Sequence, residues 1–184
     1  MTQEVTPVDA LMAEHESLLA YLLETGETSF HSTLEGTVPK VFLLAAASWM
    51  ETRVRSIMLD FFRETARDRP QTFEFIRRNA IEMKYHTFFE WRDRKPGKFF
   101  ALFGNDMKSI AAKLHKEDAE YAAQYDAFLE LGDLRNQLVH GNYVSFTLVK
   151  TAAEVEDLYR QADKFVDRLP ALLRTDLTGE ETPS

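Results

Sequence analysis

The chain of 184 residues contains no cysteine. This absence excludes disulfide bonds and thiolate metal ligands, and it favours a reducing compartment. Long hydrophobic runs are also absent, because the most apolar stretch, from Val41 to Met50, is far shorter than the roughly 20 residues of a membrane-spanning helix. The N-terminus is polar and acidic, which is not typical of a signal peptide. We therefore expect a cytoplasmic protein without membrane contact.

Several chemical motifs are missing as well. The sequence has no His-Glu-x-x-His motif, no pair of histidines at metal-ligand spacing and no Asp-rich calcium loop, so we expect no metal site. It has no Gly-rich loop that would cradle a phosphate, and no serine nucleophile elbow. We accordingly expect neither ATP nor NAD, and no other cofactor.

Charge is unevenly distributed along the chain. The net charge is −8, which argues against a general nucleic-acid coat protein. Between Arg77 and Lys116, however, ten Lys and Arg residues stand against four Asp and Glu residues. Aromatic residues are interleaved with these cations, namely Tyr85, Phe88, Phe89, Trp91, Phe99, Phe100 and Phe103.

This basic, aromatic stretch has two interpretations. Cations that meet phosphates and rings that stack on unpaired bases would suit RNA. The RNA-binding candidates are then Arg92, Arg94, Lys95 and Lys98. Alternatively, the rings belong to the hydrophobic core and the charges form a solvated face.

Helical signals dominate the chain. Thr6 is a typical N-cap before Pro7, and apolar residues then recur at helical spacing until Gly26. The expected helices span about 7–25, 39–65, 70–84, 106–115, 118–140 and 151–173, with a polar loop at 27–37 and an extended segment at 144–149. The fold class is therefore all-α, a bundle of about five main helices. We expect one domain over residues 1–175 and a disordered acidic tail at 176–184.

The residues 131–143 carry the clearest chemical signal. Arg135 can grip a phosphate with its planar fork of donors, and His140 can exchange a proton near neutral pH. Asn136 and His140 share a helix face, whereas Arg135 and His140 lie about 140° apart around an ideal helix. A joint site therefore needs the Arg135 side chain to wrap round, the helix to distort near Gly141, or a second copy of the motif from a partner subunit.

At these residues the chain resembles the HEPN superfamily, whose signature is an arginine, a polar residue and a histidine a few positions later. Residues 128–131 and 141–143, which flank the motif, resemble the RiboL-PSP branch, as does the upstream segment 95–104. The helix at 48–54, with its inward acidic residue Glu51, is also similar to that branch. The resemblance covers about Val38 to Leu173.

The resemblance implies a HEPN-like helical bundle that forms a homodimer around a shared cleft and cleaves RNA without a metal. It also implies a role in a toxin–antitoxin, phage-defence or stress system, with an antitoxin or regulatory protein as a partner. Arg135 would stabilise charge at the phosphate, His140 would transfer protons, and Asn136 would orient His140 or the phosphate. Glu51, Asn142 and Tyr143 would support this site.

Other interpretations remain open. In a purely structural interpretation, Arg135 would pair with Asp133 or Glu51 in a buried network, and His140 would merely occupy the C-terminal end of a helix. Glu51 would either orient Arg135 or form an exposed ion pair with Arg55. The chain would then be a non-catalytic HEPN-type module that binds a nucleotide, RNA or protein partner, or that only dimerises.

Overall fold

The computed structural model describes residues 5–82, 84–92 and 97–175, and these residues form helices, turns and coil without a strand. Helices account for 81% of the described residues, which confirms the all-α prediction. The expectation of about five main helices is wrong, because eight α-helices and one π-helical segment lie within the described ranges. The tail predicted at 176–184 lies outside those ranges.

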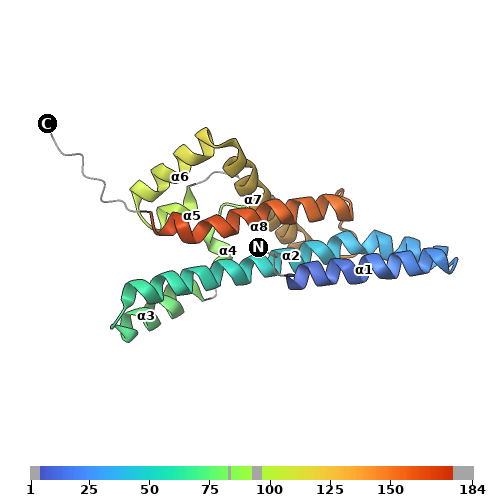
Figure 1. Cartoon of the computed structure of the whole chain (residues 1–184), viewed down its shortest axis with the longest axis horizontal. Helices are drawn as coiled ribbons and strands as arrows, with labels where there is room; N and C mark the ends of the chain where they lie inside the picture. Colours follow the sequence, from blue (N-terminus) through green and yellow to red (C-terminus); the bar gives the residue numbers. More distant parts are fainter. Residues whose placement is uncertain (1–4, 83, 93–96, 176–184) are drawn as a thin grey trace.

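The longest element is α2 (Thr28–Ala66), whose 39 residues extend about 58 Å at 1.5 Å per residue. Figure 1 shows it running the length of the molecule, with α1 (Pro7–Glu24) beside its first half. Val8 and Met12 of α1 are buried in the same core as Val38 of α2. None of the helices in the described part is both long and apolar enough to cross a membrane.

The polar loop predicted at 27–37 is instead the first part of α2, and the helix continues through Pro39. Leu34 and Val38 pack into the core, and such tertiary contacts stabilise a helix whose local sequence is a weak helix former. Pro39 donates no backbone hydrogen bond, which leaves the carbonyl group of Glu35 without its helical partner. Glu35 is exposed, so water can reach this carbonyl group.

The region between residues 70 and 117 is divided more finely than predicted. The helix expected at 70–84 ends as α3 (Pro70–Ile76) and η1 (Arg77–Ile81), because the backbone turns to an extended conformation at Glu82. The short helices α4 (Tyr85–Phe88) and α5 (Lys98–Ala101) precede α6 (Asn105–Glu117). Most aromatic rings of this region are buried, which confirms the core interpretation for Tyr85, Phe88, Phe89, Phe99 and Phe100.

The last two helices, α7 (Ala119–His140) and α8 (Ala152–Leu173), pack on one another and on α2. Both helices begin at side-chain caps, since Asp118 accepts from the backbone of Tyr121 and Thr151 forms a capping box with Glu154. Between the helices, residues 144–149 form a turn and coil rather than a strand. The C-terminal half of α7 is thereby held against the middle of α2, where the candidate site lies.

A polar cluster fixes the start of α1 to α8. Asp9 accepts hydrogen bonds from the backbone of Thr6 and from Arg160, and the Thr6 hydroxyl lies 2.7 Å from that of Tyr159. Burial opposes ionisation of Asp9, but the hydrogen bonds from Thr6 and the charge of Arg160 outweigh it and lower its pKa below 3.8. The carboxylate therefore stabilises the fold above about pH 4, and this contribution is lost as pH falls through the lowered pKa.

We expect the substitution Asp9→Asn to lower the free energy of unfolding by about 1 kcal/mol at pH 7, because a cap and an ion pair are lost together. The deficit should shrink as the pH is lowered to about 3, where the wild-type carboxyl group also begins to bind a proton. Urea denaturation at both pH values measures this deficit in the free energy of unfolding. The substitution Glu14→Gln, at an exposed residue of the same helix, is the control. An equal deficit at both pH values would contradict the assignment.

Candidate functional site

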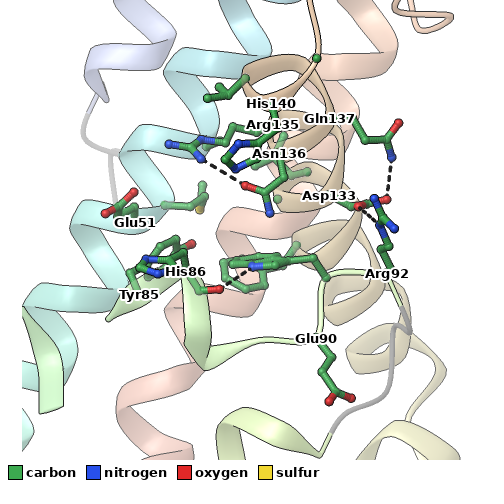
Figure 2. Close-up of a pocket in the computed structure, with 18 residues that line it drawn as sticks. Glu51, Tyr85, His86, Glu90, Arg92, Asp133, Arg135, Asn136, Gln137 and His140 are labelled. Carbon is green, nitrogen blue, oxygen red and sulfur yellow. Dashed lines mark hydrogen bonds and ion pairs between the residues drawn. The ribbon is translucent and has the colours of Figure 1, made fainter. Parts of the chain in front are cut away.

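A cavity of about 1100 Å³ opens between α2, α4 with the loop after it, and the C-terminal half of α7. The three residues selected from the sequence motif all line it. Figure 2 shows the labelled side chains around the cavity, with Arg135, Asn136 and His140 on α7, Glu51 on α2, and Tyr85 and His86 on α4. The structure thus brings Arg135 and His140 to one cavity within a single chain.

Gly141 ends α7 directly after His140, as the sequence predicted. Its amide donates to the carbonyl oxygen of Gln137 at 2.9 Å. A Cβ atom at this position would lie 2.7 Å from the same oxygen, so glycine is required by this close approach rather than by an unusual φ, which is −84°. The tight turn leaves His140 exposed at the rim of the cavity.

Arg135 is half-buried, and its Nη1 donates to Oδ1 of Asn136 at 3.1 Å. Within the described ranges it forms no ion pair. Asp133 instead accepts from Nε2 of Gln137 at 2.8 Å and lies 3.9 Å from Nε of Arg92. The alternative in which Asp133 or Glu51 neutralises Arg135 is therefore wrong, and the guanidinium retains donors for a ligand.

The Glu51 side chain lines the cavity and also lies 3.9 Å from Nη1 of Arg55 one helical turn later. The ion pair with Arg55 confirms that interpretation of Glu51. Glu51 makes no direct contact with Arg135 in the described structure, so an orienting role for Glu51 stays a prediction. The charges of Glu51 and Arg135 both act on the hydroxyl group of Tyr85. Burial raises the pKa of the Tyr85 hydroxyl, Glu51 raises it further and Arg135 lowers it. Tyr85 consequently stays protonated at neutral pH and can donate a hydrogen bond.

Two elements of the site escaped the sequence analysis. Tyr85 was considered only as part of the aromatic stretch, and His86 was not among the predicted site residues, yet both line the cavity. Trp91 lines it as well, and its Nε1 donates to the backbone carbonyl of His86 at 3.2 Å. No spacing rule would have found these residues, because α4 is brought to α7 only by tertiary packing.

Gly132 makes this packing possible. A Cβ atom on Gly132 would lie 2.1 Å from two carbons of the Trp91 ring, Cε3 and Cζ3. The indole therefore rests directly on the α7 backbone, a close approach that only glycine permits. This contact, together with the ring of Phe128 at 5.7 Å between centroids, fixes the loop after α4 against the helix that carries Arg135.

The remaining predicted residues are dispersed. Asn142 and Tyr143 do not line the cavity: the Asn142 side chain accepts from the backbone of Val144, and the carbonyl and ring of Tyr143 contact Lys40 on α2. They brace the segment that follows α7. Arg92 stands exposed at the cavity wall, and Lys98 is exposed on α5 away from it. Arg94 and Lys95 lie outside the described residues.

The cavity wall carries both signs of charge. Arg92, Arg135 and His140 line it together with the carboxylates of Glu51, Glu90 and Asp133. Across the part of the chain that the structure describes, no group of three or more His, Cys, Asp or Glu residues is placed to hold a metal ion. The arrangement offers two guanidinium groups, one phenol and two imidazoles to a bound molecule.

Comparison with known proteins gives one family. A family model described as RiboL-PSP-HEPN matches residues 13–174. No curated protein and no solved structure matches the chain. The matched range includes every residue of the cavity and extends into α1, beyond the segment from Val38 over which the sequence resemblance was recognised.

Proposed function

Since the chain belongs to the RiboL-PSP-HEPN family, we propose that it is a metal-independent endoribonuclease. HEPN domains include ribonucleases and nucleotide-binding proteins. The observation that carries the proposal is that Arg135 and the exposed imidazole of His140 line one cavity. Among the described residues, Arg135 forms no ion pair with a carboxylate.

The chemistry needs only groups that this cavity supplies. RNA carries its own nucleophile, the 2′-hydroxyl, so cleavage requires a proton acceptor, a proton donor and a stabiliser of negative charge. His140 transfers a proton at the 2′-oxygen or at the leaving 5′-oxygen. Arg135 stabilises the charge that develops on the phosphate oxygens, and Asn136 holds the guanidinium in place. The products are a 2′,3′-cyclic phosphate and a 5′-hydroxyl.

Homodimerisation is part of the proposal. Val139, Tyr143 and Val144 surround His140 in the sequence and are 49%, 43% and 88% exposed. Apolar side chains exposed at one place support a protein contact there. A twofold axis near this helix end would bring two copies of the motif together, so that the two His140 side chains can divide the acid and base roles.

A regulatory partner follows from the chemistry. An unrestrained ribonuclease damages the RNA of its own cell, so we propose a toxin–antitoxin, phage-defence or stress system in which an antitoxin or another regulatory protein restrains the enzyme. The proposed RNA contacts beyond the cavity are Arg92 at its wall and Lys98 nearby in the chain, with Arg94 and Lys95 between them.

The second candidate function is a non-catalytic module that binds a nucleotide, an RNA or a protein. The carboxylates of Glu51, Glu90 and Asp133 in the cavity wall favour it, because they repel a polyanion. The net charge of −8 has the same effect at longer range. Binding of RNA without cleavage would identify this function.

We expect the protein to cleave a mixed-sequence labelled RNA in the presence of EDTA and to leave cyclic phosphate ends. DNA of the same sequence should remain intact, because it lacks the 2′-hydroxyl. A matched RNA that carries 2′-O-methyl groups throughout is the control for contaminating activity that does not use this nucleophile. Cleavage of the DNA or of the methylated RNA would exclude the proposed mechanism.

A further inference from the structure

His86 differs from the other histidines outside the sequence motif. Its side chain is exposed at the cavity, and within the described ranges its ring forms no hydrogen bond or ion pair. The other three are engaged: His15 with the carbonyl oxygen of Leu11 at 2.9 Å, His31 with Glu35 at 3.8 Å, and His115 with Asp126 at 3.0 Å. Two unengaged imidazoles, His86 and His140, therefore face one cavity.

The backbone that carries His86 is held firmly. Its neighbour Tyr85 is 9% exposed, and Phe88 and Phe89 are 4% and 2% exposed. The His86 carbonyl accepts from the indole of Trp91, which itself rests on Gly132 of α7. The imidazole thus lines the cavity from a fixed support, and Figure 2 shows His86 beside Tyr85 on α4. Catalytic groups require a support of this kind, because small displacements lower rates strongly.

We propose that His86 is a second proton-transfer residue of the cavity and acts with His140 of the same subunit. This inference rests on the proposed nuclease function. A cavity of about 1100 Å³ slightly exceeds the roughly 300–1,000 Å³ of ordinary ligand pockets, so the cavity that both histidines line is large enough to admit one nucleotide unit. Each subunit then holds its own acid and base, and this arrangement replaces the division of the two roles between the His140 side chains of two subunits.

The step is balanced within one subunit. The 2′-oxygen forms a bond to phosphorus while the bond from phosphorus to the 5′-oxygen breaks. One imidazole, neutral at the start, takes the proton of the 2′-hydroxyl, and the other, protonated at the start, gives its proton to the 5′-oxygen. Arg135 stabilises the charge on the other phosphate oxygens. Both imidazoles return to their starting states by exchange with water.

The charged and titratable groups that line the cavity with His86 come from α2, α4, the loop after α4, and α7. They are Glu51 on α2, Tyr85 on α4, Glu90 and Arg92 in the loop after α4, and Asp133, Arg135 and His140 on α7. A reaction that needs one neutral and one protonated imidazole has a bell-shaped dependence of rate on pH. Removal of either imidazole abolishes one limb of this bell.

We expect His86→Ala to lower the cleavage rate about 100-fold at the optimal pH and to remove one limb of the pH profile. Added imidazole should restore part of the rate, which loss of a merely structural side chain would not allow. His115→Ala, which removes a histidine engaged with Asp126 outside the cavity, is the matched control and should retain both limbs. Circular dichroism melting shows whether each variant is folded.

The outcomes separate the two proposals. Wild-type cleavage together with an unchanged rate and profile for His86→Ala overturns the role of His86 and leaves the nuclease standing. A folded wild-type protein that cleaves no RNA overturns the nuclease, and the role of His86 with it. A loss of rate in His86→Ala, relative to wild type, that added imidazole does not relieve also overturns the proposed role of His86.

Mixed dimers test whether both histidines act in one subunit. A dimer of one His86→Ala and one His140→Ala subunit contains no cavity with both imidazoles, so its activity should remain at the level of the separate variants. Recovery of activity on mixing would overturn the arrangement, because it requires His86 of one subunit to act with His140 of the other.

Discussion

Replacing Arg135 with alanine is expected to lower the rate of RNA cleavage at saturating substrate about 10³-fold. The guanidinium forms no ion pair in the described ranges, so its charge is available to the phosphate rather than to a carboxylate. The fold should persist, because among the described residues Arg135 donates a hydrogen bond only to its neighbour Asn136. Single-turnover kinetics, with thermal denaturation alongside, measure both effects. Arg135→Lys should recover only part of the rate, since an ammonium group lacks the planar fork.

His140→Ala belongs to the same experiment and is expected to reduce the rate by about 10²- to 10⁴-fold, the range of a lost proton-transfer group. The matched controls are Lys164→Ala, which removes one exposed cation from α8, and His31→Ala, which removes an imidazole from α2. Both controls lie outside the cavity and should cleave at the wild-type rate. Persistence of cleavage in the Arg135 and His140 variants would place the active site elsewhere.

Gly132→Ala is expected to destabilise the fold by about 1–3 kcal/mol, because overpacking forces the neighbouring ring out of its position. In the interior of an exposed helix the same change would stabilise by about 1 kcal/mol. The sign of the change in the free energy of unfolding therefore reports on the contact with Trp91, whose ring carbons would lie 2.1 Å from the new Cβ atom. Urea denaturation gives the free energy of unfolding directly.

A double-mutant cycle isolates this contact. Trp91→Ala alone should destabilise the protein, since it removes a partly buried ring from the wall shared with Phe128. Adding Gly132→Ala to Trp91→Ala should then be neutral or stabilising, because the clash is gone and the helix propensity of alanine remains. Equal destabilisation by Gly132→Ala in both backgrounds would mean that the ring contact is not its cause.

The sequence predicted the elements whose signals are local. Thr6 before Pro7, Asp118, and Thr151 with Glu154 each mark a helix start that the structure confirms, because a side-chain cap is formed by residues three apart. The end of α7 at Gly141 was predictable for the same reason. The placement of Arg135, Asn136 and His140 in one cavity agrees with the motif, although their chemical roles remain predictions.

The remainder depends on contacts between distant segments. The first turns of α2 read as a loop, since only packing of Leu34 and Val38 reveals that they are helical. Tyr85 and His86 lie about 50 residues before the motif, and their position follows from the approach of Trp91 to Gly132. The periodic pattern of apolar residues within one segment does not reveal such an approach, because neither Trp91 nor Gly132 is unusual within its own segment.

The indole of Trp91 has a further consequence, which is optical. The chain contains two tryptophans, and Trp49 on α2 does not line the cavity, whereas Trp91 does. A protein that retains only Trp91 would carry one intrinsic fluorophore in the wall of the cavity, beside the backbone of His86. Its emission would report occupancy without a label and without turnover, so ligands that are never cleaved become visible by the same signal as substrates.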